Sequence, residues 1–347
     1  EYLNALEKSR SAHFNNGWET FHLTLSEKND LLGFLPIYKK NNSHGEFVFD
    51  HQWSYALRRA GRDYYPKLLS AIPFTPCETR KFITPESIDI QNFIEPVINH
   101  MKKENIETWH ILFPNKDLSK TLIENNFIER SGYRFVWNNR EYQSFDDFLK
   151  IFTSRQRKNI KSERKKIQSL GIKFSVKDST NMTIEDWHIF YEFYKSTYYQ
   201  RMQEPYLNFD FFTLVHEYRN SLNPVIFFAE IDGEKIAGSL CFQNKDTLYG
   251  RHWGSSINID NLHFECCYYQ GIEYCIKNNI DYFDPGVQGE HKIRRGFEPR
   301  ETRSYHYVLK KDFRNAIKSF CQEEKIGIEK YLAACNEYTP IKKEYRI

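Results

Sequence analysis

Charged side chains gather in one short segment near the end of the chain, FDPGVQGEHKIRRGFEPRETRSYHY, which spans residues 283–307. This segment directly follows an apolar run that is typical of a buried strand. Charged residues are rarely buried without a partner, and glycines let a backbone turn sharply or approach a ligand closely. Loops with such residues often carry binding or catalytic groups. We therefore predict that this segment binds an anionic or zwitterionic group.

Two histidines, His252 and His291, are candidates for a general base, because imidazole titrates near neutral pH. Either could instead be a structural histidine held by hydrogen bonds. Two carboxylates, Asp284 and Glu290, could accept a proton from an ammonium group or bind one. The alternative for Asp284 is the capping of a turn before proline, and for Glu290 it is a surface salt bridge.

Three basic side chains in the same segment, Lys292, Arg294 and Arg295, could bind phosphate or stabilise an oxyanion. Arginine suits both tasks because its guanidinium group forms bidentate hydrogen bonds. We predict no metal site.

A second basic segment, SRQRKNIKSERKKIQSLG, begins at Ser154 and carries seven Lys or Arg residues between Arg155 and Lys166. If this segment is helical, positive charge surrounds most of its circumference. Such a helix would suit the phosphates of a tRNA or of a lipid-linked precursor. A solvated surface helix is the alternative interpretation.

The composition is that of a globular protein, with 40% hydrophobic and 27% charged residues among 347. At roughly 150 residues per domain, this length predicts two domains. The formal net charge is only +3, so binding of a polyanion would depend on a local patch.

Cellular location is predicted from hydropathy and cysteine usage. No run approaches the ~18 apolar residues that span a bilayer, and the first residues lack the apolar stretch of a signal peptide. The 7 cysteines form no Cys-x-x-Cys pair, which disfavours both a zinc site and a disulfide framework. We expect a cytoplasmic protein without an integral membrane segment.

The first half of the chain alternates strand and helix patterns. Three antiparallel strands are predicted within residues 18–50, including one at EFVFD. Helices are predicted over residues 52–60, 64–70 and 88–103, and TWHILF at 108–113 reads as a strand. The aromatic residues near position 60 could stack on a ligand, but their spacing is more typical of a core.

The second half shows the same pattern more clearly. Helices are predicted over residues 185–201 and 209–218, followed by a three-stranded antiparallel meander within 224–254. A helix over 262–276 and a strand at IDYFDPG complete the unit. Two helices, three strands, a helix and a strand form the layout of the GNAT N-acyltransferase fold. We therefore predict an α/β protein with mixed sheets and two tandem GNAT-like domains, residues 1–150 and 151–347.

Long segments of the sequence resemble the FemAB-like family of peptidoglycan biosynthesis or recognition proteins. They are GEFVFDHQWSYALRRAGRDYYPKLLSAIPFTP, SRQRKNIKSER, LYGRHWG, LHFECCYYQGIEYCI and GVQGEHKIRRGFEP. One departure is Val136, where the resemblance leads us to expect histidine. Fem proteins use two GNAT-like domains to transfer an amino acid from aminoacyl-tRNA to an amine of a cell-wall precursor peptide. The resemblance implies this class of reaction.

The resemblance also predicts where the reaction takes place. In a GNAT fold the fourth and fifth strands diverge, and their ends form the slot for the acyl group. Here those ends bring together Arg251, His252, Trp253 and Asp284. Strand alternation places Arg251 and Trp253 on one face and His252 on the other, so only one set is expected to line the slot. The lysine of the Fem pattern Phe-Lys-x-Gly-Phe aligns with Arg294, or with Lys292 after a shift.

Three functions are compatible with these observations. The first is transfer of an acyl or aminoacyl group to an amine of a small molecule or peptide, with acyl-CoA or aminoacyl-tRNA as co-substrate and no tightly bound cofactor. The second is acetyl-CoA-dependent acetylation of a small amine, although the segment RHWGSSINIDN lacks the usual pyrophosphate loop for coenzyme A. The third is a non-catalytic module that recognises peptidoglycan or another peptide.

Overall fold

The structure is a computed structural model that describes residues 1–287 and 289–346, and it forms two compact units. Unit 1 comprises residues 1–11, 134–300 and 333–347, and unit 2 comprises residues 12–133 and 301–332. These units do not coincide with a single boundary near residue 150.

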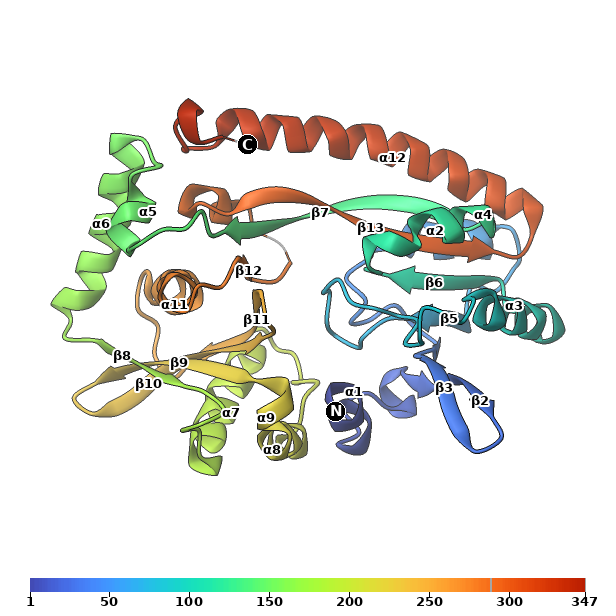
Figure 1. Ribbon diagram of the computed structural model, residues 1–347, viewed down its shortest axis with the longest axis horizontal. Coiled ribbons are helices and arrows are strands. Elements are labelled where there is room, and N and C mark those ends of the chain that lie inside the picture. Colours follow the sequence, from blue (N-terminus) through green and yellow to red (C-terminus); the bar gives the residue numbers. More distant parts are fainter. Residues whose placement is uncertain (288, 347) are drawn as a thin grey trace. The chain divides into compact units, whose positions relative to one another are not determined.

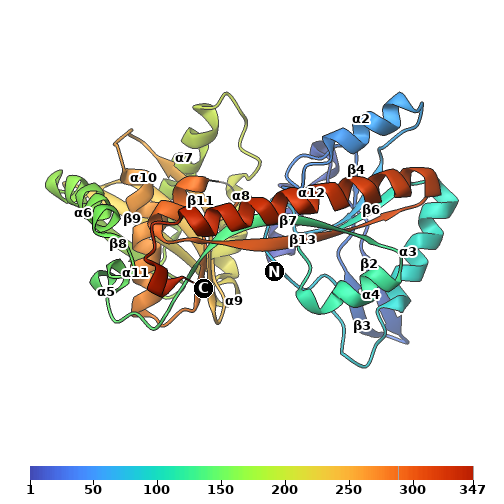
Figure 2. The ribbon, with the colours of Figure 1, turned by 90° about the horizontal axis from the view of Figure 1, so that it is seen from above.

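Three long elements explain why one cut does not separate the units. They are β7 (Ile128–Asn138), β13 (Glu298–Val308) and α12 (Lys311–Tyr338), and each begins in one unit and ends in the other. Figure 2 shows α12 as one uninterrupted helix.

Unit 1 contains a mixed sheet with helices on both faces. Its helices are α1 (Tyr2–Lys8), α5 (Phe145–Leu149), α6 (Ser154–Ser169), α7 (Ile184–Tyr199), α8 (Phe209–Glu217), α9 (Arg219–Leu222), α10 (Leu262–Phe264), the π-helical turn η3 (Glu265–Tyr269), α11 (Gln270–Lys277) and the 3₁₀ segments η4 (Glu290–Arg295) and η5 (Lys343–Tyr345). Its further strands are β8 (Lys173–Lys177), β9 (Pro224–Ile231), β10 (Glu234–Gln243), β11 (Thr247–Ser255) and β12 (Tyr282–Asp284).

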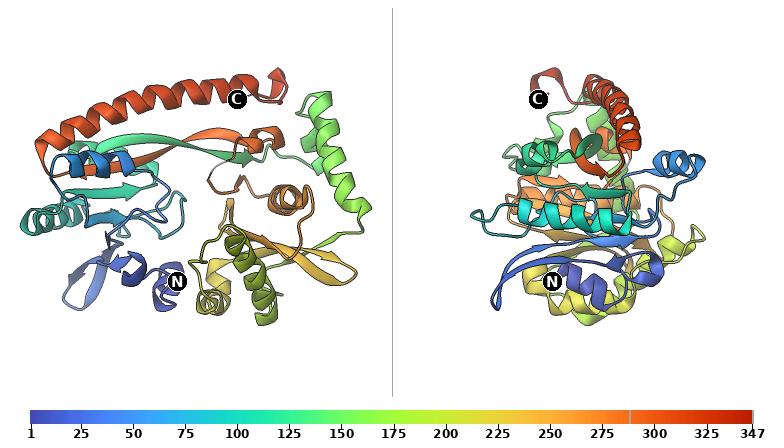
Figure 3. Two further views of the ribbon diagram at one scale, coloured as in Figure 1. Left: turned by 180° about the vertical axis from the view of Figure 1, so that it is seen from behind. Right: turned by 90° about the vertical axis from the view of Figure 1, so that its right-hand side faces the viewer.

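The sheet of unit 1 runs in the order β7-β12-β11-β10-β9-β8. Strands β8 to β11 are antiparallel, which confirms the predicted meander, and β11 and β12 are parallel. Figure 1 shows α7 and α8 on one face of the meander and α11 on the other, and Figure 3 shows the same arrangement from behind. This order of elements is the one predicted for a GNAT-like unit.

Local sequence explains where the principal helices of unit 1 begin. Thr183 and Asp186 form a reciprocal capping box at the start of α7, and the Asn208 side chain accepts a hydrogen bond from the Phe211 amide at the start of α8. The helix predicted over residues 262–276 carries an apolar stripe, in which Cys266 and Ile272 are fully buried.

Unit 2 contains the other strands of the mixed sheet and a separate hairpin. Its elements are η1 (Phe14–Asn16), β1 (Glu19–Thr20), β2 (Leu23–Glu27), β3 (Asp30–Leu35), β4 (Tyr38–Lys40), α2 (His51–Arg59), β5 (Lys67–Ser70), α3 (Gln91–Glu104), β6 (Thr108–Leu112), η2 (Lys116–Leu118) and α4 (Ser119–Glu124). The sheet runs in the order β1-β4-β5-β6-β13, and β2 pairs only with β3.

The parallel pair β5 and β6 is connected through α3, in the same way that β11 and β12 are connected through α10 to α11. One face of this sheet is apolar and packs Leu68, Trp109 and Ile111 against Phe93 and Val97 of α3. The opposite face carries buried polar side chains at alternate positions: Lys40, Lys67, Thr108, His110, Ser304 and His306.

Two predictions for unit 2 were wrong. Residues 64–70 contain strand β5 rather than a helix, because Pro66 cannot supply a helical N–H and the four residues of β5 are buried on both faces, as in other parallel strands. The segment EFVFD is irregular rather than a strand. Its two carboxylates, Glu46 and Asp50, both reach Lys67, whereas an extended strand would hold them roughly 13 Å apart.

Candidate active site

A cavity opens in unit 1 where the parallel strands β11 and β12 stop pairing. Their register runs from Thr247 opposite Tyr282 to Tyr249 opposite Asp284, after which β11 continues to Ser255 paired with β10 but not with β12. The cavity has a volume of about 520 Å³. Its walls come from α7, β10, β11, the turns between residues 263 and 268, and the segment that follows β12. The cavity thus lies where the acyl slot is predicted, and we call it the slot.

A β-bulge at Arg251 decides which residues of β11 face the slot. In the pairing with β10, Leu240 lies opposite His252 but Cys241 lies opposite Gly250, so Arg251 is the extra residue. The bulge shifts the alternation at Arg251, whereas His252 and Trp253 still lie on opposite faces of β11. All three line the cavity, because β12 no longer covers this part of the strand and both faces border the opening. The expectation that only one set would do so is therefore not met.

Helix α7 forms one wall of the slot and is bound directly to the edge of β11. The hydroxyl of Thr197 donates to the carbonyl of Trp253 over 2.8 Å, and that of Ser196 donates to the carbonyl of Ser255 over 2.8 Å. Gly254 permits this approach, because a side chain there would collide with the carbonyl of Phe193. The wall that carries Tyr194 and Tyr198 is thus held against the strand.

His252 is buried in this wall, with its ring against Tyr194 and Tyr206 at centroid distances of 5.1 and 5.9 Å. Burial, reinforced by the charge of Arg251, lowers its pKa well below 6.5. On the opposite face, Trp253 packs edge-to-face against His263 at 5.4 Å. Burial, together with nearby cations and His291, lowers the pKa of His263 to about 4. Both histidines are therefore neutral at neutral pH.

His291 lies at the mouth of the slot and is exposed, unlike His252. Its Nε2 atom lies 2.8 Å from the hydroxyl of Tyr268. Burial of part of the ring, followed by the charges of Arg295 and Lys292, lowers its pKa below 6.5. An accessible, neutral imidazole that a hydrogen bond orients can accept a proton.

Lys292 is buried below His291, with 2% of its surface exposed. Its Nζ donates to the carbonyl of Gly286 over 2.7 Å, and the side chain lines the slot. Burial lowers its pKa to about 8, against the opposing effect of Asp284. Most Lys292 side chains are consequently charged at pH 7.

Asp284 lies beneath the slot rather than in its lining. It forms a buried ion pair with Arg134 over 2.7 Å, and its second oxygen accepts the amide of Gly286 over 3.1 Å. This geometry fixes the turn after β12, whose carbonyl at Gly286 binds Lys292. Asp284 therefore positions the turn.

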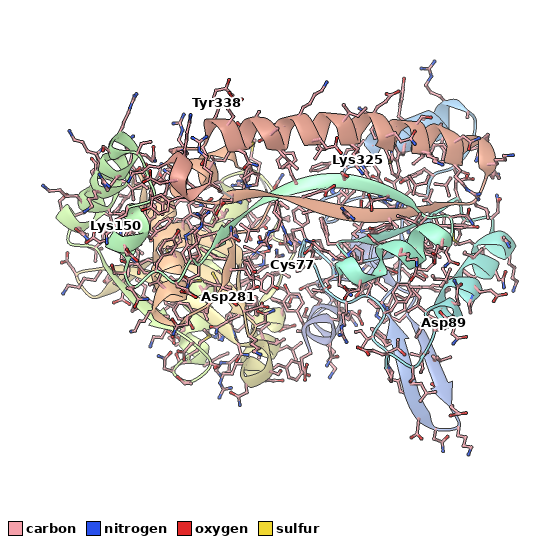
Figure 4. All side chains as sticks on the ribbon, turned by 45° about the horizontal axis from the view of Figure 1, so that its top comes forward. Cys77, Asp89, Lys150, Asp281, Lys325 and Tyr338 are labelled. Carbon is pink, nitrogen blue, oxygen red and sulfur yellow. The ribbon has the colours of Figure 1, made fainter. Side chains whose placement is uncertain are left out.

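A second, larger cavity of about 1,050 Å³ lies beside α6. Arg155, Asn159, Ser162 and Lys166 line it at helical spacing, so they form a single face of the predicted basic helix. Tyr338, labelled in Figure 4, also lines it and is exposed. We call this cavity the basic groove.

The remaining predicted site residues belong to the basic groove. Glu290 and Arg294 are exposed along it. Arg295 is buried, stacks on Phe264 at 3.4 Å and bonds to Glu163 of α6 over 2.8 Å. His291 lines both the groove and the slot, so the two cavities adjoin at this residue.

Several residues of the site were not predicted. Tyr268 and Arg201 line the slot, and Arg134 holds Asp284. Tyr268 belongs to a segment that carries the family resemblance, but no role was predicted for any of the three. The π-helical turn at Glu265–Tyr269 changes the direction of the Tyr268 side chain relative to a regular α-helix, and no sequence pattern predicted this turn.

A model of the FemAB-like family, described as peptidoglycan biosynthesis/recognition, matches residues 1–343. This chain belongs to the FemAB-like family. No curated protein matches it. The family assignment confirms the resemblance carried by the five sequence segments.

Solved structures share the fold of this FemAB-like chain at low identity. FemX has a TM-score of 0.53 and 11% identity, with 90% of this chain and 93% of FemX covered. L-PGS from Bacillus licheniformis has a TM-score of 0.52 and 10% identity, with 89% and 91% covered. The C-terminal DUF2156 domain of an Agrobacterium fabrum protein has a TM-score of 0.54 and 8% identity, with 91% and 96% covered. The predicted mixed α/β fold of the Fem type is confirmed.

Two further properties of the FemAB-like chain concern its described residues only. They contain no group of three His, Cys, Asp or Glu side chains that could hold a metal ion. None of their helices is long and apolar enough to cross a membrane.

Proposed function

We propose that unit 1 transfers an acyl or aminoacyl group from an activated ester or thioester to an amine. The observation that carries this proposal is the position of His291, which lines both the slot and the basic groove and is oriented by Tyr268. Membership of a family described by peptidoglycan biosynthesis or recognition supports it. An amine of a peptidoglycan-related peptide is accordingly the proposed acceptor.

The chemistry needs a neutral amine, a proton acceptor and stabilisation of an oxyanion. Positive charge from Arg251 and Lys292 favours the neutral form of an amine that enters the slot. The amine nitrogen forms a bond to the carbonyl carbon, and His291 takes the released proton. The carbon–oxygen or carbon–sulfur bond then breaks, and His291 returns the proton to the leaving group. Lys292 is placed to stabilise the oxyanion between these steps.

The basic groove favours a donor that carries several phosphates. Arg155, Lys166 and Arg294 place positive charge along it, and Arg295 is already paired with Glu163. An extended row of cations suits the backbone of an RNA better than a single pyrophosphate. We therefore propose aminoacyl-tRNA as the donor, with its acyl end reaching the slot past His291.

Donor identity can be tested by incubating the protein with labelled acetyl-CoA and, separately, with tRNA charged with labelled amino acids, across a panel of amines and peptidoglycan peptides. We expect transfer of the label from charged tRNA and none from acetyl-CoA. The His291→Gln variant, which should fold normally, is the matched control and should lose transfer. Transfer from acetyl-CoA alone would overturn the donor assignment. No transfer from either donor would overturn the enzymatic proposal and favour a recognition module.

A further inference from the structure

The charged side chains that line the slot are cations. Arg201, Arg251 and Lys292 line it, and no aspartate or glutamate does so among the residues that the structure describes there. Resting on the proposed transfer reaction, we propose that the slot holds a group that bears a carboxylate.

The nearest carboxylates are committed to other cations. Asp284 pairs with Arg134, and Glu265 pairs with Arg164 over 2.9 Å. Lys292 donates to a neutral carbonyl instead. A cation that is almost fully buried and lacks a neighbouring anion in direct contact is costly, and a ligand carboxylate would compensate for it.

The neutral side chains in the slot do not alter this balance. His252 and His263 remain uncharged at neutral pH because burial disfavours their protonation. Burial likewise raises the pKa of the Cys267 thiol to about 12, so it adds no negative charge. These groups can still donate hydrogen bonds, as can Ser239.

Arg201 is the residue placed to select the carboxylate. It follows α7, is exposed, and lies close enough to His263 for its charge to lower the pKa of that ring. An exposed guanidinium group at the rim of a cavity can bind a carboxylate through two parallel hydrogen bonds. The same charges disfavour an ammonium group, so lysine-like groups are predicted to enter poorly.

The carboxylate can belong to the transferred acyl group or to the molecule that supplies the amine. The slot volume of about 520 Å³ accommodates either small group. Two pairs of probes separate these sources. N-acetylglutamate α-methyl ester and N-acetylglutamine α-methyl ester represent the acyl group, whereas alanine and alaninamide represent the acceptor.

Binding of the four probes to the full chain is measured by calorimetry, which does not depend on transfer activity. We expect the carboxylate member of at least one pair to bind about tenfold more tightly than the member with an amide in place of the carboxylate. Discrimination only in the first pair places the carboxylate on the acyl group, and discrimination only in the second places it on the acceptor. Failure of transfer with retained discrimination would overturn the proposed function but not this inference.

The Arg201→Gln variant should reduce this preference to within about twofold without altering the melting temperature, because Arg201 is exposed. Lys158→Gln is the matched control, since Lys158 is exposed and lines neither cavity. Equal or tighter binding of the two probes that carry an amide in place of the carboxylate would overturn the inference. An unchanged preference in Arg201→Gln would overturn it too. Absence of binding by all four probes at millimolar concentration would also overturn it.

Discussion

Each unit contains one pair of parallel strands, β11 and β12 in unit 1 and β5 and β6 in unit 2, and the two pairs differ in what lies beyond their ends. In unit 1 the chain leaves a cavity beyond β11 and β12. In unit 2 the chain itself continues the pairing beyond β6, with Thr79 bridged to Pro114. The buried Lys81 closes this end, donating to the carbonyl of Phe113 over 3.0 Å and to the hydroxyl of Thr79 over 2.6 Å. The same topology is therefore open in one unit and sealed by a lysine in the other.

The buried polar groups of unit 2 bond to one another. Lys67 bonds to Glu46 over 2.8 Å and to Asp50. The hydroxyl of Tyr64 donates to Asp50 over 2.6 Å, and His110 lies between Tyr64 and His306. Burial keeps both histidines neutral by lowering their pKa well below 6.5.

A chain of hydrogen bonds runs through this network. The Nε2 atom of His110 lies 3.1 Å from the oxygen of Tyr64 and 3.0 Å from that of Thr108. Its Nδ1 atom bonds to Nδ1 of His306, whose Nε2 atom lies 2.9 Å from the hydroxyl of Ser304. Tyr64 donates to Asp50, so the chain ends at that carboxylate.

The comparison shows that the groups around a histidine or lysine, and not its residue type, indicate whether its role is structural or functional. His306 and Lys67 are enclosed by protein groups that complete their hydrogen bonds, so their role is structural. His291 and Lys292 face a cavity, so their remaining hydrogen bonds are available to a ligand.

The largest expected effect is on the network of unit 2. Lys67→Met leaves the carboxylates of Asp50 and Glu46 buried without their cation, and we expect it to lower the free energy of unfolding by about 3–5 kcal/mol. Urea unfolding at pH 8, above the pKa of about 7 to which burial raises Glu46, measures this loss. The triple variant with Glu46→Gln and Asp50→Asn should recover much of it. A loss below about 1 kcal/mol would contradict a structural role.

A smaller effect is expected when the orientation of His291 is disturbed. Tyr268→Phe removes the hydroxyl that bonds to Nε2, and we expect kcat to fall about tenfold with KM little changed. Tyr274→Phe is the matched control, because its hydroxyl bonds to Gln243 over 2.8 Å in the same helical region. Equal losses in both variants would indicate a general structural effect.

The basic groove should respond to single charges by only a few-fold. Lys166→Gln removes a cation from the groove face of α6, and the slope of log(kcat/KM) for charged tRNA against log salt should decrease by about one. Lys158→Gln removes a charge from another part of the helix and should leave the slope unchanged. Identical slopes in the two variants would show that the groove does not bind the donor.

The smallest effect concerns pH. A general base must be neutral, so the rate should fall as pH decreases through the pKa of His291, which burial, Arg295 and Lys292 lower below 6.5. The midpoint of the acidic limb should therefore lie below pH 6.5. Lys292→Met removes one cation and should move the midpoint upward, whatever its effect on the maximal rate. A midpoint that is unaffected would assign the limb to another group.

Much of the fold of unit 1 could be predicted because the strands of the meander are apolar runs separated by polar turns, and because the helix after residue 261 carries an apolar stripe. Strand β5 could not, because four residues buried on both faces resemble a piece of helix. The charged residues and glycines around His291 predicted that this segment belongs to a binding site. Its partners could not be predicted, because Tyr268 and Arg134 are separated from His291 and Asp284 by 23 and 150 positions. Only folding brings them together.

The central claim is tested most directly by comparing His291→Gln with His306→Gln, two histidine substitutions in different units. The transfer rate per folded molecule and the free energy of unfolding are measured for both. We predict that His291→Gln loses ~10²–10⁴ in rate with unchanged stability. His306→Gln should lose about 1–3 kcal/mol of stability and retain its rate. Loss of rate in His306→Gln with normal transfer in His291→Gln would contradict the assignment of chemistry to unit 1.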